Sequence, residues 1–216
     1  MAVNVEKLIR ADLRRQARSR LRSAAAAGLF IIGGAVALAL MMGVGPDLGQ
    51  ERARFWWMAA VLAGSIVGGM MLIMRSGAAA YARWLAALGL GIPVAIALVM
   101  RGPDGESTWM TGLGCSVGIF LASMLSMAVL LLLVVDKIPA SRRGKLGTFL
   151  FLGAVAALGG TLMIHVHCPV RVGSHLAWHV LAAWLGTIVL GWFGMRFHAA
   201  WLRLEFQAQV GEEPEE

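Results

Sequence analysis

Two cysteines and a group of histidines are the residues of this chain with the most reactive side chains. Cys168 lies in the segment IHVHCPVRVGSHLAWH, and Cys115 lies earlier, in GLGCSVG. Thiolate and imidazole groups bind zinc and copper, and two thiols can also form or exchange a disulfide. The histidines in the Cys168 segment are four of the chain's five: His165, His167, His175 and His179.

Three interpretations of this group are open from sequence alone. Cys115 and Cys168 form a redox pair if their Cα atoms lie within about 7 Å. Alternatively, the group holds a transition-metal ion, although the spacing matches no standard zinc module. In the third interpretation the histidines only bond to water and backbone, and the thiols behave as small apolar groups. The metal candidates are His165, His167, Cys168, His175 and His179, of which the last two share one helix face.

Other chemistry is not indicated by the sequence. It contains no phosphate-binding loop, no dinucleotide fingerprint and no acidic pair suited to acid–base catalysis. A b-type haem needs histidines that face each other from two helices, whereas these crowd one rim. We therefore predict that the chain is not an enzyme and has no cofactor, with a transition-metal ion as the one exception.

Long apolar helices must position these residues. Hydrophobic residues make up 59% of the chain and charged residues 14%, against about 25% charged in an average soluble domain. A helix needs about 20 apolar residues to cross a bilayer. Six stretches without Asp, Glu, Lys or Arg meet this need, at residues 24–43, 55–74, 84–100, 111–135, 146–164 and 176–195. The sequence predicts an all-α polytopic membrane protein with six transmembrane helices.

Glycines within these stretches are expected to let helices approach closely. They are Gly64, Gly68 and Gly69 in the second stretch, and Gly153, Gly159 and Gly160 in the fifth.

The basic residues predict the orientation of the helices. If the amino terminus is cytoplasmic, only Arg52, Arg54, Arg101 and Arg171 of the 19 Lys and Arg residues lie outside. This positive-inside bias places both termini in the cytoplasm of a bacterial inner membrane and both cysteines at its outer side. The net charge of +7 then reflects topology, and no direct contact with nucleic acid is expected. A cleaved signal peptide at residues 1–43 is disfavoured, because the basic region is too long.

Three parts follow from this topology: a cytoplasmic head at 1–23, a bundle at 24–195 and a helical, finally acidic tail at 196–216. In the head, Val5, Leu8, Ile9 and Leu13 recur at helical spacing between arginines. Such a helix can lie on anionic lipid, or its apolar stripe can bind a cytoplasmic protein. The periodicity alone favours lipid, whereas Asp12 beside the stripe slightly favours a protein partner, so both alternatives stay open.

Four segments taken together resemble the NrsF-type family of bacterial membrane anti-sigma factors. They are KLIRADLRR in the head, GPDLGQERARFWWM before and into the second span, GLGCSVGIFLASM in the fourth, and HCPVRVGSHLAWH before the sixth. The resemblance covers about residues 5–197, with the segments in the family's order and spacing.

The resemblance implies a regulator. In this family the head holds an extracytoplasmic-function sigma factor at the bilayer until an outer signal, an oxidant or a metal, releases it. The family's signal-sensing cysteine pair corresponds to Cys115 and Cys168. We expect the sigma factor to contact Val5, Leu8, Ile9, Asp12 and Leu13.

The chain departs from the family pattern at several places. Ser126 and Met127 occupy a region where relatives often carry proline, and the chain continues well beyond the sixth span. His165 and His175 are not part of the pattern. The alternative function is a small membrane transporter or channel, or a metal- or haem-binding membrane subunit.

Overall fold

The computed structural model describes residues 5–43, 52–74, 109–138, 143, 145–168 and 173–211, together with a few positions between 84 and 95. Every regular element in these ranges is helical, which confirms the predicted all-α class. The elements are α1 (Val5–Met42), α2 (Arg52–Met74), α4 (Trp109–Leu133), the short 3-10 helix η1 (Val135–Lys137), α5 (Leu146–His167) and α6 (Gly173–Gly211).

Five of the described helices, α1, α2, α4, α5 and α6, are long and apolar enough to cross a membrane. They correspond to the first, second, fourth, fifth and sixth predicted spans. The third predicted span, 84–100, lies outside the described residues except for Trp84, Ala87, Leu88, Gly91 and Ala95, which are helical. The chain is thus built as a helical membrane protein.

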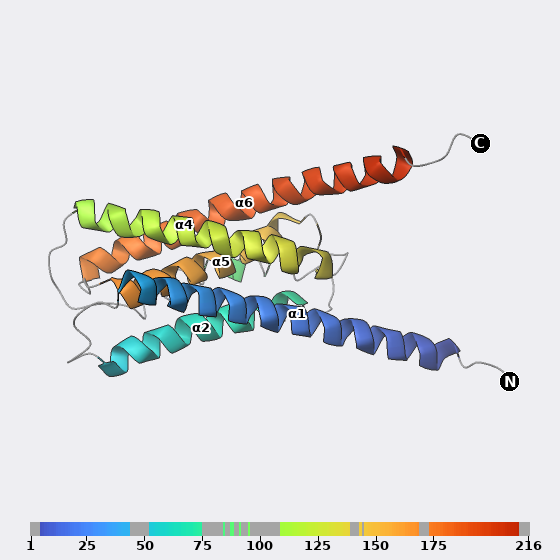
Figure 1. The fold of residues 1–216 in the computed structure, drawn as a ribbon, viewed down its shortest axis with the longest axis horizontal. Helices are drawn as coiled ribbons and strands as arrows, with labels where there is room; N and C mark the ends of the chain where they lie inside the picture. Colours follow the sequence, from blue (N-terminus) through green and yellow to red (C-terminus); the bar gives the residue numbers. More distant parts are fainter. Residues whose placement is uncertain are drawn as a thin grey trace.

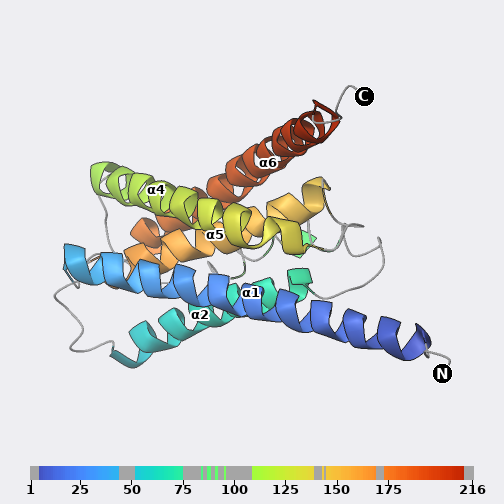
Figure 2. The same ribbon diagram turned by 45° about the vertical axis from the view of Figure 1, so that its right-hand side comes forward.

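Helix α5 lies at the centre of the bundle, in contact with α1, α2, α4 and α6 (Figure 1 and Figure 2). In the most apolar stretch of α5, 94% of the residues are buried, whereas this share is 28–39% in the other four helices. A helix that is apolar on all sides is expected to be surrounded in this way. The outer helices instead expose large apolar side chains such as Phe30, Trp56 and Leu121, which suits a lipid-facing surface.

Glycines of α5 permit these close contacts. A Cβ atom on Gly153 would lie 2.5 Å from the carbonyl oxygen of Thr187 in α6, and one on Gly160 would clash with the carbonyl oxygen of Ile119 in α4. The expectation is therefore confirmed for α5. For Gly64 and Gly68 of α2, no atom of the described residues lies within 4 Å of the position that their Cβ would take, so no close approach is seen there within the described part of the chain.

Gly160→Ala should therefore destabilise the bundle, whereas Gly64→Ala should not. The new methyl group at residue 160 meets backbone of α4, which can move only with its whole helix, so we expect a cost of about 1–3 kcal/mol. The same methyl group at residue 64 meets no atom of the described residues. Thermal unfolding of the two purified variants in one detergent measures the difference, and equal midpoints would contradict this packing.

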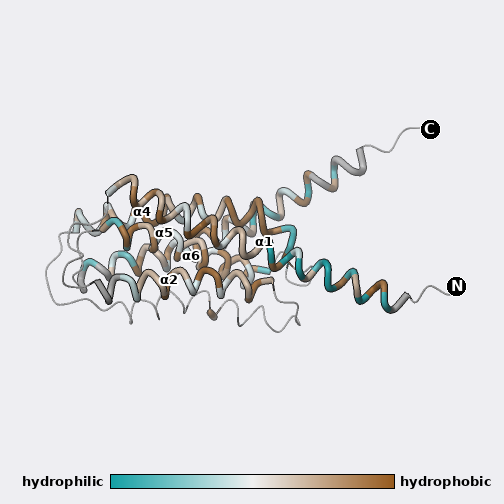
Figure 3. Tube along the Cα trace, turned by 60° about the horizontal axis from the view of Figure 1, so that its bottom comes forward, coloured by the Kyte–Doolittle hydropathy of each residue, from teal (hydrophilic) through white to brown (hydrophobic). Residues whose placement is uncertain are grey.

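Helices α1 and α6 extend beyond the bundle at the same end and diverge there (Figure 1 and Figure 2). Helix α1 has 38 residues, which gives a length of about 57 Å against about 30 Å of hydrocarbon. The head is thus a direct continuation of the first span, and α6 likewise carries the tail as far as Gly211. Figure 3 shows hydrophilic turns where α1 leaves the bundle.

Candidate metal centre

Both cysteines and two histidines meet at the end of the bundle opposite the projecting parts of α1 and α6. One ligand atom from each of Cys115, Cys168, His175 and His179 lies within 4.8 Å of all the others. Cys115 is half-buried and the other three residues are buried. We call these four residues the Cys2His2 cluster. The redox interpretation requires the two thiols to lie close together, and the structure places them side by side.

The distances within the cluster are those of ligating groups without a disulfide. The Sγ atoms of Cys115 and Cys168 are 3.7 Å apart, far beyond the about 2.05 Å of a covalent sulfur–sulfur bond. The Sγ atom of Cys168 lies 3.1 Å from Nε2 of His175. The rings of His175 and His179 meet edge to face, with centroids 4.8 Å apart.

Local structure explains how α5 and α6 contribute their three residues. Helix α5 ends at His167, and the next residue, Cys168, caps it, because its backbone N–H donates a hydrogen bond to the carbonyl of Ile164 at 2.7 Å. Helix α6 begins at Gly173. His175 and His179 lie one helical turn apart, so both side chains point to the same face.

Helix α4 is held beside α6 at the same level. The hydroxyl of Ser116, next to Cys115, donates hydrogen bonds to the carbonyls of Gly112 at 2.9 Å and Trp178 at 3.3 Å. The indole ring of Trp178 occupies the space where a Cβ atom on Gly112 would lie. Cys115 is therefore fixed at the level of His179, the residue that follows Trp178.

His179 has an unusual environment. Its side chain is 2% exposed, and among the described residues neither ring nitrogen has a hydrogen-bond partner. A buried polar group without a partner costs about 1–3 kcal/mol. An ion held by the cluster would remove this cost, because one ring nitrogen would then bind the ion.

Two of the predicted metal candidates, His165 and His167, do not join the cluster. His165 is buried within α5, and Nδ1 of His167 donates to the carbonyl of Gly43, just beyond α1, at 2.7 Å. Cys115 joins the metal candidates in their place. The sequence did contain a signal for Cys115: the fourth predicted span, which carries it, begins at the outer side, as does the sixth span, which directly follows His175 and contains His179.

The predicted sigma-binding residues lie at the other end of the molecule, on the projecting part of α1. Leu8, Ile9 and Leu13 are 58%, 55% and 59% exposed. Asp12 is also exposed and accepts a hydrogen bond from Nε2 of Gln16 at 2.9 Å. Val5 begins α1, but its side chain lies outside the described residues.

No protein-family model, curated protein or solved structure matches this chain. The chemistry must therefore be inferred from the cluster itself. Two thiols and two imidazoles could bind a metal ion, since these are the ligand types of tetrahedral zinc sites. The thiol pair could alternatively be oxidised to a disulfide, because both sulfurs are within reach of each other.

Proposed function

We propose that this chain is an anti-sigma factor of the bacterial inner membrane. In this proposal six helices cross the bilayer, both termini are cytoplasmic, and the head binds an extracytoplasmic-function sigma factor. An oxidant or a metal ion at the outer Cys2His2 cluster releases that partner. The partners are the sigma factor and the lipid bilayer, with no catalysis and no direct contact with nucleic acid. The resemblance of four segments to the NrsF-type family supports this proposal.

One observation carries the proposal: a single helix connects the cysteine end of the bundle to the exposed head. At the cysteine end, the residue after α1 is Gly43, and its carbonyl accepts the hydrogen bond of His167, which directly precedes Cys168. At the other end of the same helix, the stripe that includes Leu8 and Leu13 is exposed. A displacement of Cys168 is therefore transmitted to the helix that carries the head.

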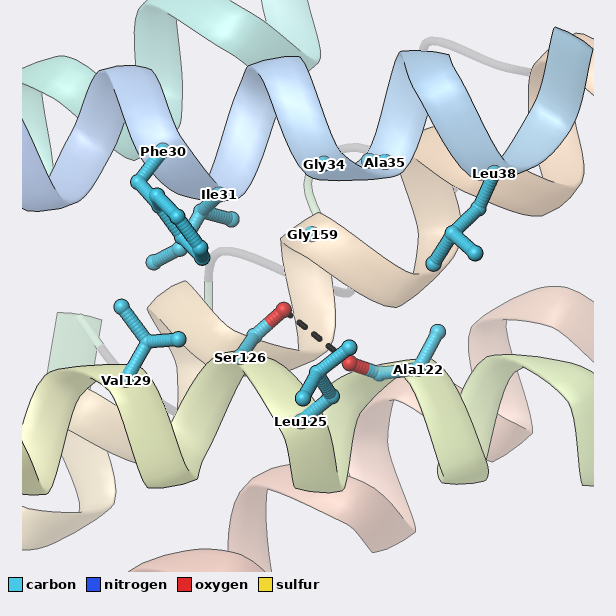
Figure 4. Close-up of a pocket in the computed structure, with 10 residues that line it drawn as sticks. All are labelled: Phe30, Ile31, Gly34, Ala35, Leu38, Ala122, Leu125, Ser126, Val129 and Gly159. Carbon is cyan, nitrogen blue, oxygen red and sulfur yellow. Dashed lines mark hydrogen bonds between the residues drawn. The ribbon is translucent and has the colours of Figure 1, made fainter.

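A second contact links α4, which carries Cys115, to α1. A Cβ atom on Gly159 of α5 would lie 2.6 Å from Cγ2 of Ile31 in α1 and 2.8 Å from Oγ of Ser126 in α4. These three residues surround a groove between α1 and α4 (Figure 4). Because the three helices meet so closely here, a shift of α4 must change the packing of α1.

The redox step can be written in full. The two thiols lose two electrons and two protons to a peroxide, a sulfur–sulfur bond forms, and the peroxide oxygen–oxygen bond is cleaved to give two molecules of water from hydrogen peroxide. The sulfurs approach from 3.7 Å to about 2.05 Å, which moves the start of α4 toward the end of α5. Release of most of the partner needs a few kcal/mol, and a disulfide supplies about 2–4 kcal/mol.

Co-purification tests this proposal against the transporter alternative. The full chain, solubilised in detergent, should carry with it a sigma factor of the extracytoplasmic-function class. A chain that lacks residues 1–22 should insert into the membrane and carry none. If the chain is a transporter, its flux should persist after the same deletion. The structure gives the transporter little support, because α5 occupies the centre of the described bundle, where a pore would run. Recovery of no sigma factor with the full chain would contradict the proposal.

A further inference from the structure

We infer that Cys115, Cys168, His175 and His179 form a tetrahedral site for a divalent d10 cation, Zn²⁺ or Cd²⁺. The inference deepens the proposed function, because it names the class of ligand that the outer end of the bundle recognises. The binding itself can be measured without any sigma factor. Its ligands come from α4, the end of α5 and the first turns of α6.

Two of the distances between ligand atoms are close to those of one tetrahedral ion, and all four atoms lie within 4.8 Å of one another. Zinc binds sulfur at about 2.3 Å and imidazole nitrogen at about 2.0–2.1 Å, so tetrahedral angles place two sulfurs about 3.8 Å apart and a sulfur–nitrogen pair about 3.6 Å apart. The Sγ atoms of Cys115 and Cys168 are 3.7 Å apart. Nε2 of His175 lies 3.1 Å from Sγ of Cys168, so a shift of about half an ångström completes that edge of the tetrahedron.

The environment of His179 is a second, independent indication of a ligand. This imidazole is buried, lies within 4.8 Å of the other three ligand atoms, and has no hydrogen bond at either nitrogen from any residue that the structure describes. A core histidine with a purely structural role is expected to be satisfied by protein or water. A bond from one ring nitrogen to a metal ion accounts for both its position and its burial.

Charge balance selects a divalent ion. When the ion binds, each thiol gives up its proton to solvent, so two thiolates and one divalent cation leave a neutral site. A monovalent ion would leave a net negative charge among buried groups, which is costly. Magnesium and calcium are excluded by the ligand types, since both ions require oxygen. Soft sulfur and imidazole ligands in a tetrahedron select Zn²⁺ or Cd²⁺.

Metal binding and oxidation must compete for the same sulfurs. The ion holds α4, α5 and α6 together at one end, whereas a disulfide joins only Cys115 to Cys168 and leaves the two imidazoles behind. The two states therefore differ in how the start of α6 is held. An oxidant that converts the thiolates to a disulfide expels the ion, because a disulfide has no thiolate left to bind it.

Cobalt substitution tests the site directly. The full chain, purified in detergent with its thiols reduced, should bind one equivalent of Co²⁺, with the intense visible bands of tetrahedral cobalt and a thiolate charge-transfer band, and Zn²⁺ should displace it. His179→Ala, His179→Gln and Cys115→Ser should each weaken binding at least tenfold and abolish the tetrahedral bands. His167→Gln is the matched control and should bind as the wild type does, because residue 167 lies outside the cluster.

Two results would overturn the inference: no uptake of Co²⁺ or Zn²⁺ by the reduced wild-type chain, or full-affinity tetrahedral binding by both His179 variants. If the variants fail to fold, the wild-type chain in native membranes still decides the question. There Zn²⁺ or Cd²⁺ should slow the alkylation of Cys115, the half-buried thiol of the cluster, at least tenfold, and an unchanged rate would overturn the site. If the wild-type chain captures the sigma factor but binds no metal, only this inference is wrong. If it binds the metal but captures no sigma factor, only the proposed function is wrong.

Discussion

Leu8→Ala combined with Leu13→Ala should lower the affinity for the sigma factor by about a hundredfold or more. Both side chains are more than half exposed on the projecting part of α1, so a partner can bury them. Burial of one leucine contributes about 1.5–3 kcal/mol, and each 1.4 kcal/mol is a factor of ten in affinity. Titration of the purified variant with the co-purified sigma factor measures the loss.

Arg14→Ala combined with Arg18→Ala is the matched control for this experiment. These arginines lie on the opposite face of the same helix turns and are also exposed. Their loss should change the affinity less than tenfold and mainly alter its salt dependence, because exposed charges contribute little and are screened. If the arginine pair costs more than the leucine pair, the head binds through charge and the apolar stripe is not the docking surface.

Cys115→Ser combined with Cys168→Ser should make release of the sigma factor insensitive to oxidant and to metal. Hydroxyl groups form no disulfide and are poor ligands for soft cations, so neither signal can change the contact between α4 and α5. Transcription from a promoter that requires the sigma factor should stay at its repressed level after peroxide or Cd²⁺ treatment. The wild-type chain should respond to at least one of the two.

Capture of the sigma factor provides the control for this double variant. The cluster and the head lie at opposite ends of α1, so untreated cells with the variant should retain the sigma factor as the wild type does. Normal capture together with a normal response to peroxide and to Cd²⁺ would show that the signal enters elsewhere, and the assignment of Cys115 and Cys168 as sensing residues would be wrong.

The helices could be predicted from sequence because their apolar stretches are long and free of charge. The positions at which the helices end were predicted less accurately. The fourth predicted span runs to Val135, but α4 ends at Leu133 and a short 3-10 helix follows. The continuity of α1 was implicit in the sequence, since no proline or glycine separates the head from the first span between residues 5 and 27. The central position of α5 was not predictable, because lipid tails are as apolar as leucine.

The site could be predicted only in part. The predicted topology places Cys115 and Cys168 at one end of the bundle, but contact between them depends on which helices are neighbours and does not follow from the sequence. The identity of the histidines does not follow, because the rotation of each helix decides which side chain reaches the thiols. His167 is adjacent to Cys168 in sequence yet bonds to Gly43, whereas His179, eleven residues further on, reaches the cluster. Helix packing therefore outweighs sequence proximity at this site.

The affinity of the purified chain for its sigma factor, measured before and after the Cys115–Cys168 disulfide forms, tests the coupling between the two ends most directly. The reduced chain should bind tightly and the oxidised chain at least tenfold more weakly. A reductant should restore the original affinity. Equal affinities, with the disulfide verified by mass spectrometry, would mean that the cysteine end of the bundle does not control the head, and the account would be contradicted.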